Sequence, residues 1–326
     1  MFSLCTRFPQ VSADHIVDQF SPPPRFADVR FSNYIPDVNE PSQQNALEQM
    51  QAFAKPIQTK SSLFGKNKKQ KGRGIYLDGG FGVGKTHLLA ALFHEYSGKS
   101  TYASFVEYTN LVGALGFEQT VNALSKFNLI CIDEFELDDP GDTVLMSTLL
   151  NRLVDQGVNI AATSNTLPDR LGEGRFAADD FMREIQGLAA HFDVVRVDGP
   201  DYRHREHEQA APPRPDSALE LGPAGFALDE MSDLDLHLQK VHPSAYASLL
   251  KEVTQLNIRN LFPLTNQANA LRWVVFIDRL YDLQIPVAYS GSPIDELFST
   301  EMKKGGYRKK YFRAISRFSA LSREAQ

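Results

Sequence analysis

The sequence predicts an α/β protein in which a parallel five-stranded sheet lies between helices, followed by a small, mainly helical C-terminal domain. Two observations predict this class. Short apolar strands alternate with helical segments over residues 75–198, a pattern typical of a parallel sheet covered by helices. After a linker rich in proline, alanine and glutamate, helical spacing of the apolar residues dominates to residue 322.

Length and composition are those of a soluble globular protein with more than one domain. The 326 residues exceed the roughly 150 that one domain needs. A net charge of −6 disfavours nucleic acid as the main partner. Two cysteines without zinc spacing indicate a reducing compartment. The N-terminus does not resemble a signal peptide and no apolar run approaches the ~20 residues of a membrane span, so we expect a cytoplasmic protein.

Polar stretches divide the chain. Residues 55–74 are rich in lysine and predict a loop, and residues 206–225 predict a linker. We therefore expect an N-terminal segment and strap, a core domain, a linker and a C-terminal helical domain, over residues 1–60, 61–205, 206–230 and 231–326 respectively.

The individual elements follow from apolar periodicity. The run 128–133 is continuously apolar, as in a strand that is buried on both faces. Five strands are expected in the core, over residues 75–78, 100–105, 128–133, 158–165 and 192–198. Helices are expected over residues 85–96, 143–157, 244–253, 268–283, 293–302 and 309–322, with a further strand over 285–290.

A glycine-rich loop follows the first strand. Gly79, Gly84, Lys85 and Thr86 fit the pattern G-x-x-x-x-G-K-[ST]. Glycines let successive amide groups face an anion, and the helix that follows directs its positive end to the same place. Lys85 would reach the β- and γ-phosphates of ATP, and Thr86 would hold Mg²⁺. The residues expected to bind the nucleotide are Gly79, Gly80, Phe81, Gly82, Val83, Gly84, Lys85, Thr86 and His87.

Two acids follow the buried strand 128–133. Asp133 and Glu134 would lie at the carboxyl end of the sheet, where open α/β sheets bind ligands. Asp133 would hold Mg²⁺ directly or through water, and Glu134 would polarise the attacking water as a general base. The alternative is a pair of solvated acids at the end of a strand.

The strand 158–165 ends in Asn165, beside the acidic strand. Such a side chain can hold the water and sense the γ-phosphate. Asparagine is also common as a helix cap, so a cap or turn role stays open for Asn165.

Four segments together resemble one family. GGFGVGKTHLL, CIDEFELDDPGD, ATSNTLPDRL and VDGPDYRHR, in this order, are similar to the ZapE cell-division ATPases, which are bacterial relatives of the Afg-type mitochondrial ATPases within the AAA+ superfamily. ALRWVVFIDRLYDLQIPV resembles the lid of that family. The resemblance implies a P-loop AAA+ core with a helical lid, Mg²⁺-dependent ATP hydrolysis, and remodelling of a protein partner, with the division protein FtsZ as the leading candidate.

The resemblance also implies a ring in which an arginine completes the site of the neighbouring subunit. Arg175 and Arg183 follow the strand that ends at Asn165 and are both candidates, although each also fits an ordinary surface ion pair. Arg272 resembles the lid arginine that contacts the nucleotide within one subunit, or it forms an interdomain ion pair.

Some functions stay open. Residues 26–37 fold over the adenine or form a strap across the core. Lys66–Arg73 is a solvated loop, or a patch for nucleic acid or a membrane surface, and Lys303–Phe318 binds anions or packs as an amphipathic helix. A helicase loader that acts with single-stranded DNA and a slow nucleotide switch are the alternatives to a protein-remodelling ATPase.

Overall fold

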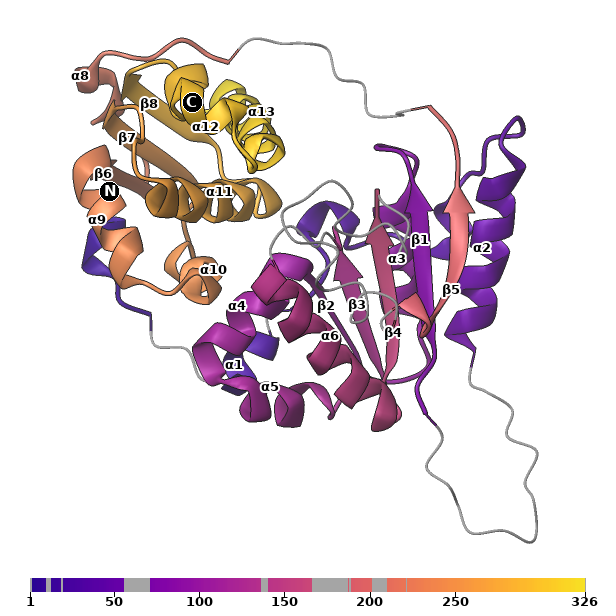
Figure 1. Cartoon of the computed structure of the whole chain (residues 1–326). Helices are drawn as coiled ribbons and strands as arrows, with labels where there is room; N and C mark the ends of the chain where they lie inside the picture. The colour runs from indigo at the N-terminus through magenta and orange to yellow at the C-terminus, as the bar shows by residue number, and fades with distance from the viewer. Residues whose placement is uncertain are drawn as a thin grey trace, which may run out of the picture. The chain divides into compact units, whose positions relative to one another are not determined.

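The computed structural model describes residues 2–9, 13–18, 20–55, 71–135, 140–165, 187, 189–200, 210–220 and 222–325. The chain folds into two compact units (Figure 1): residues 12–204 form the core unit, and residues 1–11 with 205–326 form the C-terminal unit. The four ranges given above stay a prediction. Within the described residues, no helix is both long and apolar enough to cross a membrane.

The core unit contains one parallel sheet of five strands, in the order β2-β3-β4-β1-β5. The strands are β1 (Gly74–Gly79), β2 (Ser100–Ser104), β3 (Leu129–Asp133), β4 (Asn159–Ser164) and β5 (Phe192–Val197). Each overlaps one of the five expected strands, which confirms the predicted fold class. Since β3 lies between β2 and β4 and helices cover both faces, its first four residues must be apolar, and all four are fully buried.

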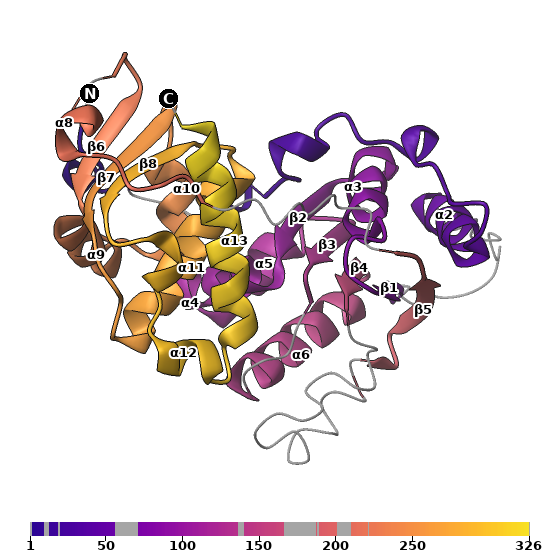
Figure 2. The same ribbon diagram turned by 90° about the horizontal axis from the view of Figure 1, so that it is seen from above.

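Helices cover both faces of this sheet (Figure 2). They are α1 (Ala13–Asp18), α2 (Pro41–Ala54), α3 (Lys85–Glu95), α4 (Phe105–Leu115), α5 (Phe117–Leu124) and α6 (Pro140–Asp155). On one face α2 and α3 share an apolar core with Ile75 and Leu77 of β1. The opposite face carries α4, α5 and α6, with α1 packed against α5.

The sequence analysis did not predict α4 and α5. Ser104 ends β2 and at once caps α4, because its hydroxyl accepts from the amide of Glu107 while the Glu107 carboxylate accepts from the amide of Ser104. This capping box is the reason that the strand expected to reach Phe105 stops at Ser104.

The C-terminal unit is mainly helical, as expected, but it also contains a parallel sheet in the order β6-β7-β8. Only the third of these strands was predicted. The strands are β6 (Phe226–Glu230), β7 (Gln255–Leu261) and β8 (Val287–Gly291). The helices are α8 (Asp216–Leu219), α9 (Met231–Lys240), α10 (Tyr246–Leu249), α11 (Gln267–Asp282), α12 (Thr300–Lys304) and α13 (Arg308–Glu324).

The prediction of one helix over residues 244–253 is wrong. A 3₁₀ turn over Pro243–Ala245 and the short α10 take its place. Glu252, with a φ of 64°, then turns the chain into β7.

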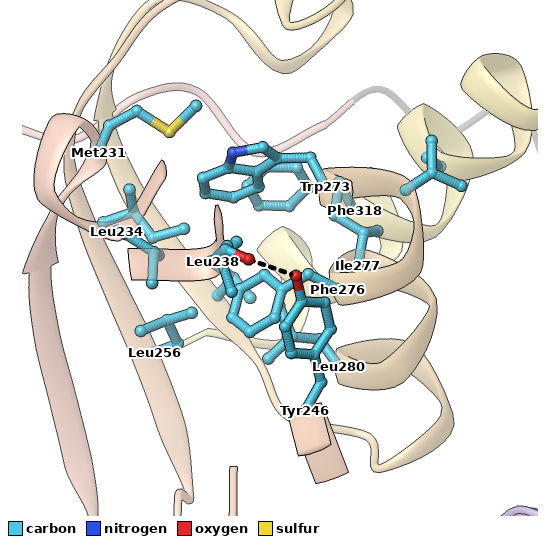
Figure 3. Close-up of a cluster of buried hydrophobic side chains, with 14 of the residues drawn as sticks. Met231, Leu234, Leu238, Tyr246, Leu256, Trp273, Phe276, Ile277, Leu280 and Phe318 are labelled. Carbon is cyan, nitrogen blue, oxygen red and sulfur yellow. Dashed lines mark hydrogen bonds between the residues drawn. The ribbon is translucent and has the colours of Figure 1, made fainter. Parts of the chain in front are cut away.

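An apolar core holds the C-terminal unit together (Figure 3). Trp273 and Phe276 of α11 meet edge to face with ring centroids 5.7 Å apart. The Tyr246 hydroxyl donates to the Leu238 carbonyl at 3.0 Å, so this buried polar group has a partner. The labelled side chains come from α9, α10, β7, α11 and α13 and are Met231, Leu234, Leu238, Tyr246, Leu256, Trp273, Phe276, Ile277, Leu280 and Phe318.

The first residues of the chain belong to this unit. Phe2 pairs with Ala227 beside β6. The buried carboxylate of Asp229 accepts hydrogen bonds from the Ser3 hydroxyl and from the Leu4 amide at 2.9 Å. The N-terminal segment is therefore divided, because its later part packs in the core unit.

Candidate active site

The predicted phosphate loop joins β1 to α3 at the carboxyl edge of the core sheet. Gly84 has a φ of 95°, in the left-handed region where an L side chain is strained. A Cβ on Gly79 would lie 2.0 Å from the carbonyl oxygen of Val197 on the neighbouring strand β5. Both glycines are therefore required by the backbone, and the loop leads directly into the positive end of α3.

Lys85 is the first residue of α3, and it is only 7% exposed. Its Nζ atom donates to the carbonyl oxygens of Gly79, at 2.9 Å, and Gly80, and to Oδ1 of Asn165 at 3.0 Å. Asn165 directly follows β4. The residue expected to reach the phosphates thus contacts the residue expected to sense them, as a shared site requires.

Asp133 ends β3 and collects donors from three neighbouring elements. Its Oδ1 atom accepts from the hydroxyls of Thr86, at 3.3 Å, and Thr163, and from the Glu134 amide at 3.1 Å. Its Oδ2 atom accepts from the Tyr102 hydroxyl at 2.9 Å. Burial and the nearby Glu134 carboxylate raise the pKa of Asp133, and the hydrogen bonds from Thr163, Tyr102 and the Glu134 amide oppose the rise.

Glu134 has a φ of 53°, an uncommon and strained value for a residue with a side chain. Two hydrogen bonds to Thr163 hold this turn. The Glu134 amide donates to Oγ1 of Thr163 at 3.2 Å, and the Phe135 amide donates to the Thr163 carbonyl at 2.7 Å. Phe135 is fully buried and packs edge to face against Phe105 and Tyr76. The surrounding structure therefore fixes where Glu134 leaves the sheet.

The N-terminal segment lies against the loop. A Cβ on Gly84 would lie 2.8 Å from Cε2 of Tyr34. The Tyr34 ring meets the His87 ring edge on, with centroids 5.2 Å apart, and the His87 Nε2 and Asn33 Oδ1 atoms are 3.1 Å apart. Burial lowers the pKa of His87. Residues 33 and 34 are thus in contact with the start of α3, and contact with adenine stays a prediction.

An ion pair at the base of the loop was not predicted. Asp78 immediately precedes Gly79, and its side chain is 2% exposed. It pairs with Arg196 directly across the register of β1 and β5, and Arg196 also donates to Asp198 at 2.7 Å. Without that arginine, the buried Asp78 carboxylate would lack its positive partner immediately before the loop.

The oxygen atoms and the positive charge of this site fit Mg²⁺ and a nucleoside triphosphate. Mg²⁺ prefers oxygen ligands and commonly uses one or two protein oxygens together with phosphates and water. The Thr86 hydroxyl and the Asp133 carboxylate carry oxygens of this kind and lie together at the end of β3. Lys85 supplies a positive charge at the same edge of the sheet, beside Asn165.

The other expected site residues differ in their exposure and in their place in the fold. Phe81 is 55% exposed, whereas the Val83 side chain is buried in the core and leaves only its backbone for a ligand. Arg272 lies on α11 of the C-terminal unit. Burial raises the pKa of Tyr246, and the nearby Arg272 opposes that rise. Arg175 and Arg183 lie outside the described residues.

The family of the chain follows from comparison with known proteins. The sequence profile of the AFG1-like ATPase family matches residues 10–218 and 215–326, almost the whole chain. The chain belongs to this family. The resemblance inferred from the motifs is thereby confirmed, and so is the ATPase class at the level of the family.

Individual relatives match over shorter stretches. Cell division protein ZapE of Escherichia coli (strain K12) is 31% identical over 163 residues, 45% of this chain and 44% of that protein. Replicative helicase loader DnaI of Bacillus subtilis is 28% identical over 189 residues, 52% of this chain and 57% of that protein. The chain thus spans less than half the length of ZapE.

Solved structures resemble the chain more distantly. A crystal structure of DnaI is 20% identical, with a TM-score of 0.43, and covers 56% of this chain and 94% of that one. AMPPCP-bound DnaA from Aquifex aeolicus is 16% identical, with a TM-score of 0.41, over 52% of this chain and 50% of that one.

The sequence analysis did not identify three site residues, Asp78, Tyr102 and Arg196, and it covered Tyr34 only as part of the segment 26–37. A signal existed for Asp78, which is an acid at the end of an otherwise apolar strand. Arg196 pairs with it through strand register, and Tyr102 reaches Asp133 from the next strand. Those contacts depend on strand order, which no local pattern encodes.

Proposed function

We propose that this protein binds ATP together with Mg²⁺ and hydrolyses the bond between the β- and γ-phosphates. One observation supports the proposal most strongly. Four predicted residues from three separate segments lie within hydrogen-bonding distance at one edge of the sheet, since Lys85 contacts Asn165 and Thr86 contacts Asp133. These residues lie at the carboxyl ends of parallel strands, which is where α/β folds bind ligands.

Each residue has a role in this proposal. Lys85 and the amides of the glycine loop bind the phosphates, and Thr86 and Asp133 hold Mg²⁺, which would neutralise charge on the phosphate oxygens. Glu134 accepts a proton from the attacking water, and Asn165 orients that water. The strained turn at Glu134 supports this role, because such strain is concentrated at functional sites.

The test is ATP turnover together with binding of a fluorescent ATP analogue. Lys85→Ala should reduce kcat at least about 100-fold, because it removes positive charge from the developing negative charge of the transition state. Glu134→Gln should bind the analogue as wild type does and turn ATP over at least about 100-fold more slowly. Undiminished turnover in Lys85→Ala, or lost binding in Glu134→Gln, would contradict the site.

Assembly into a ring, with or without a requirement for ATP, belongs to the same proposal. Arg175 or Arg183 would then complete the site of a neighbouring subunit. The specific ATPase rate should rise with protein concentration and collapse in one of the two alanine variants. A rate that is flat with concentration and unaffected by both substitutions would count against a shared site.

We infer remodelling of a protein partner in the cytoplasm as the output. The relative from Escherichia coli is named as a cell division protein, which supports a role in division with FtsZ as the first partner to test. Stimulation of turnover by FtsZ polymer, absent in Glu134→Gln, is the expected result.

A second candidate is a helicase loader, and the match to DnaI favours it. Stimulation by single-stranded DNA that falls steeply between 50 mM and 200 mM salt would support that function. A net charge of −6 speaks against it.

A further inference from the structure

The carboxylate of Asp133 is held from both sides of its strand. β3 lies between β2 and β4 in the sheet, and each neighbour contributes one hydroxyl. Tyr102 of β2 donates to Oδ2 at 2.9 Å, and Thr163 of β4 donates to Oδ1. A carboxylate so bonded on both oxygens has one preferred rotation about its Cβ–Cγ bond.

The two oxygens are bonded unequally. Oδ1 accepts from Thr163, from the Glu134 amide and from Thr86. Oδ2 accepts from Tyr102. An ionised carboxylate offers about two lone-pair sites per oxygen, so Oδ2 keeps capacity for a further partner. The hydrogen bond from Tyr102 therefore determines the direction in which the remaining lone pair of Oδ2 points.

The Tyr102 ring is itself fixed. Tyr102 is 3% exposed and packs edge to face against Phe93, with ring centroids 6.1 Å apart. Thr163 is 2% exposed and also accepts from the Glu134 amide, so its hydroxyl joins the two acids. Both hydroxyls are thus rigidly placed, as residues that orient a metal ligand must be.

The geometry points to Tyr102 and Thr163 as positioning residues that set the orientation of Asp133 and thereby the affinity of the site for Mg²⁺ bound with nucleotide. This inference rests on the proposed function. Neither residue touches the reacting atoms in this role, since both act through Asp133. Removing a group that orients a metal ligand typically costs about 10–100-fold in metal affinity.

A matched control exists on the same strand. Tyr108 of α4 is 1% exposed, and its hydroxyl donates at 3.2 Å to the carbonyl of Cys131, two residues before Asp133. Tyr108→Phe and Tyr102→Phe therefore each remove one buried tyrosine hydroxyl that bonds to β3. Only the second removes a bond to the carboxylate.

The experiment measures Kd for a fluorescent ATP analogue with excess Mg²⁺ and with EDTA, and the Mg²⁺ midpoint at fixed analogue. Tyr102→Phe should raise the Mg²⁺ midpoint about 10-fold or more and leave the Kd in EDTA within about 2-fold of wild type. Tyr108→Phe should leave both unchanged. Thr163→Val should behave as Tyr102→Phe does, and Thr163→Ser should restore the wild-type midpoint.

Two results would overturn the inference. One is a Mg²⁺ midpoint in Tyr102→Phe that equals that of Tyr108→Phe. The other is an equal loss of binding in Mg²⁺ and in EDTA, which a purely structural role would cause. Wild-type protein that binds no nucleotide would instead refute the proposed function, and this inference with it.

Discussion

The phosphate loop and the end of β3 lie at the same edge of the core sheet but are held by different means. The loop takes its shape from the conformation of its own glycines, with Gly84 in the left-handed region. The end of β3 is held by side chains from other elements, because Tyr102 and Thr163 bond to Asp133 from neighbouring strands.

The difference separates two kinds of structural information. A loop that depends on glycine conformations is encoded within a few consecutive residues, so it tolerates change elsewhere in the chain. A carboxylate held by distant hydroxyls depends on strand order and register, so a substitution in β2 or β4 can alter it while leaving the loop intact. The contact of Tyr34 with the loop and the ion pair of Arg196 with Asp78, just before the loop, are exceptions to this contrast, and they allow it to be tested.

The largest effect is expected from Gly84→Ala. The new Cβ meets two obstacles, a φ of 95° and Cε2 of Tyr34 at 2.8 Å. Left-handed strain alone costs about 1–2 kcal/mol, and the overlap adds to it. We expect a loss of about 2 kcal/mol or more in the core unit, with weaker binding of the fluorescent ATP analogue.

Tyr34→Ala separates the two causes. In that background, Gly84→Ala should lose only the strain, about 1–2 kcal/mol. The free energy of unfolding by urea, followed by circular dichroism, is measured for the wild type, the two single variants and the double variant, which together form a double-mutant cycle. Equal costs in both backgrounds would mean that the loop depends on its backbone alone and that Tyr34 does not constrain it.

The contrast also explains how much of the fold and of the candidate site could be predicted from the sequence. The central strands β1 and β3 were found because buried parallel strands are largely apolar runs. Lys85, Thr86, Asp133 and Glu134 were found because their spacing is local. The strands β6 and β7 were missed. Tyr102 was missed because only the sheet order brings its hydroxyl to Asp133.

The second effect concerns the ion pair at the base of the loop. Arg196→Ala leaves the Asp78 carboxylate, 2% exposed, without its positive partner. Breaking a fully buried pair costs about 3–5 kcal/mol. Since the Arg196 side chain is 56% exposed, water compensates in part, and we expect about 1–2 kcal/mol.

Arg152→Ala is the matched control. It breaks an ion pair with Glu118 whose side chains are 49% and 67% exposed, so about 0–0.5 kcal/mol is expected. Adding Asp78→Asn to Arg196→Ala should recover part of the loss, because the buried charge is gone. Equal stabilities for the two arginine variants would show that Asp78 does not depend on Arg196.

The smallest effect is a pH dependence at the loop. Burial lowers the pKa of His87 from its ordinary value of 6.5. Between the lowered pKa and 6.5, the unfolded chain binds more protons than the folded protein, so the free energy of unfolding rises with pH. The stabilisation that comes with a neutral His87 is fully present above pH 6.5 and is lost as the pH falls from 6.5 through the lowered pKa of His87.

His242 provides the comparison, because burial lowers its pKa as well and it lies in the C-terminal unit. Trp273 is the single tryptophan of the chain and lies in that unit, so its fluorescence follows the unfolding of the C-terminal unit. His87→Gln should flatten the pH profile of circular dichroism and leave that of Trp273 fluorescence unchanged, whereas His242→Gln should flatten the fluorescence profile. A circular dichroism profile unaltered by His87→Gln would mean that the titration of His87 does not contribute to the stability of the core unit.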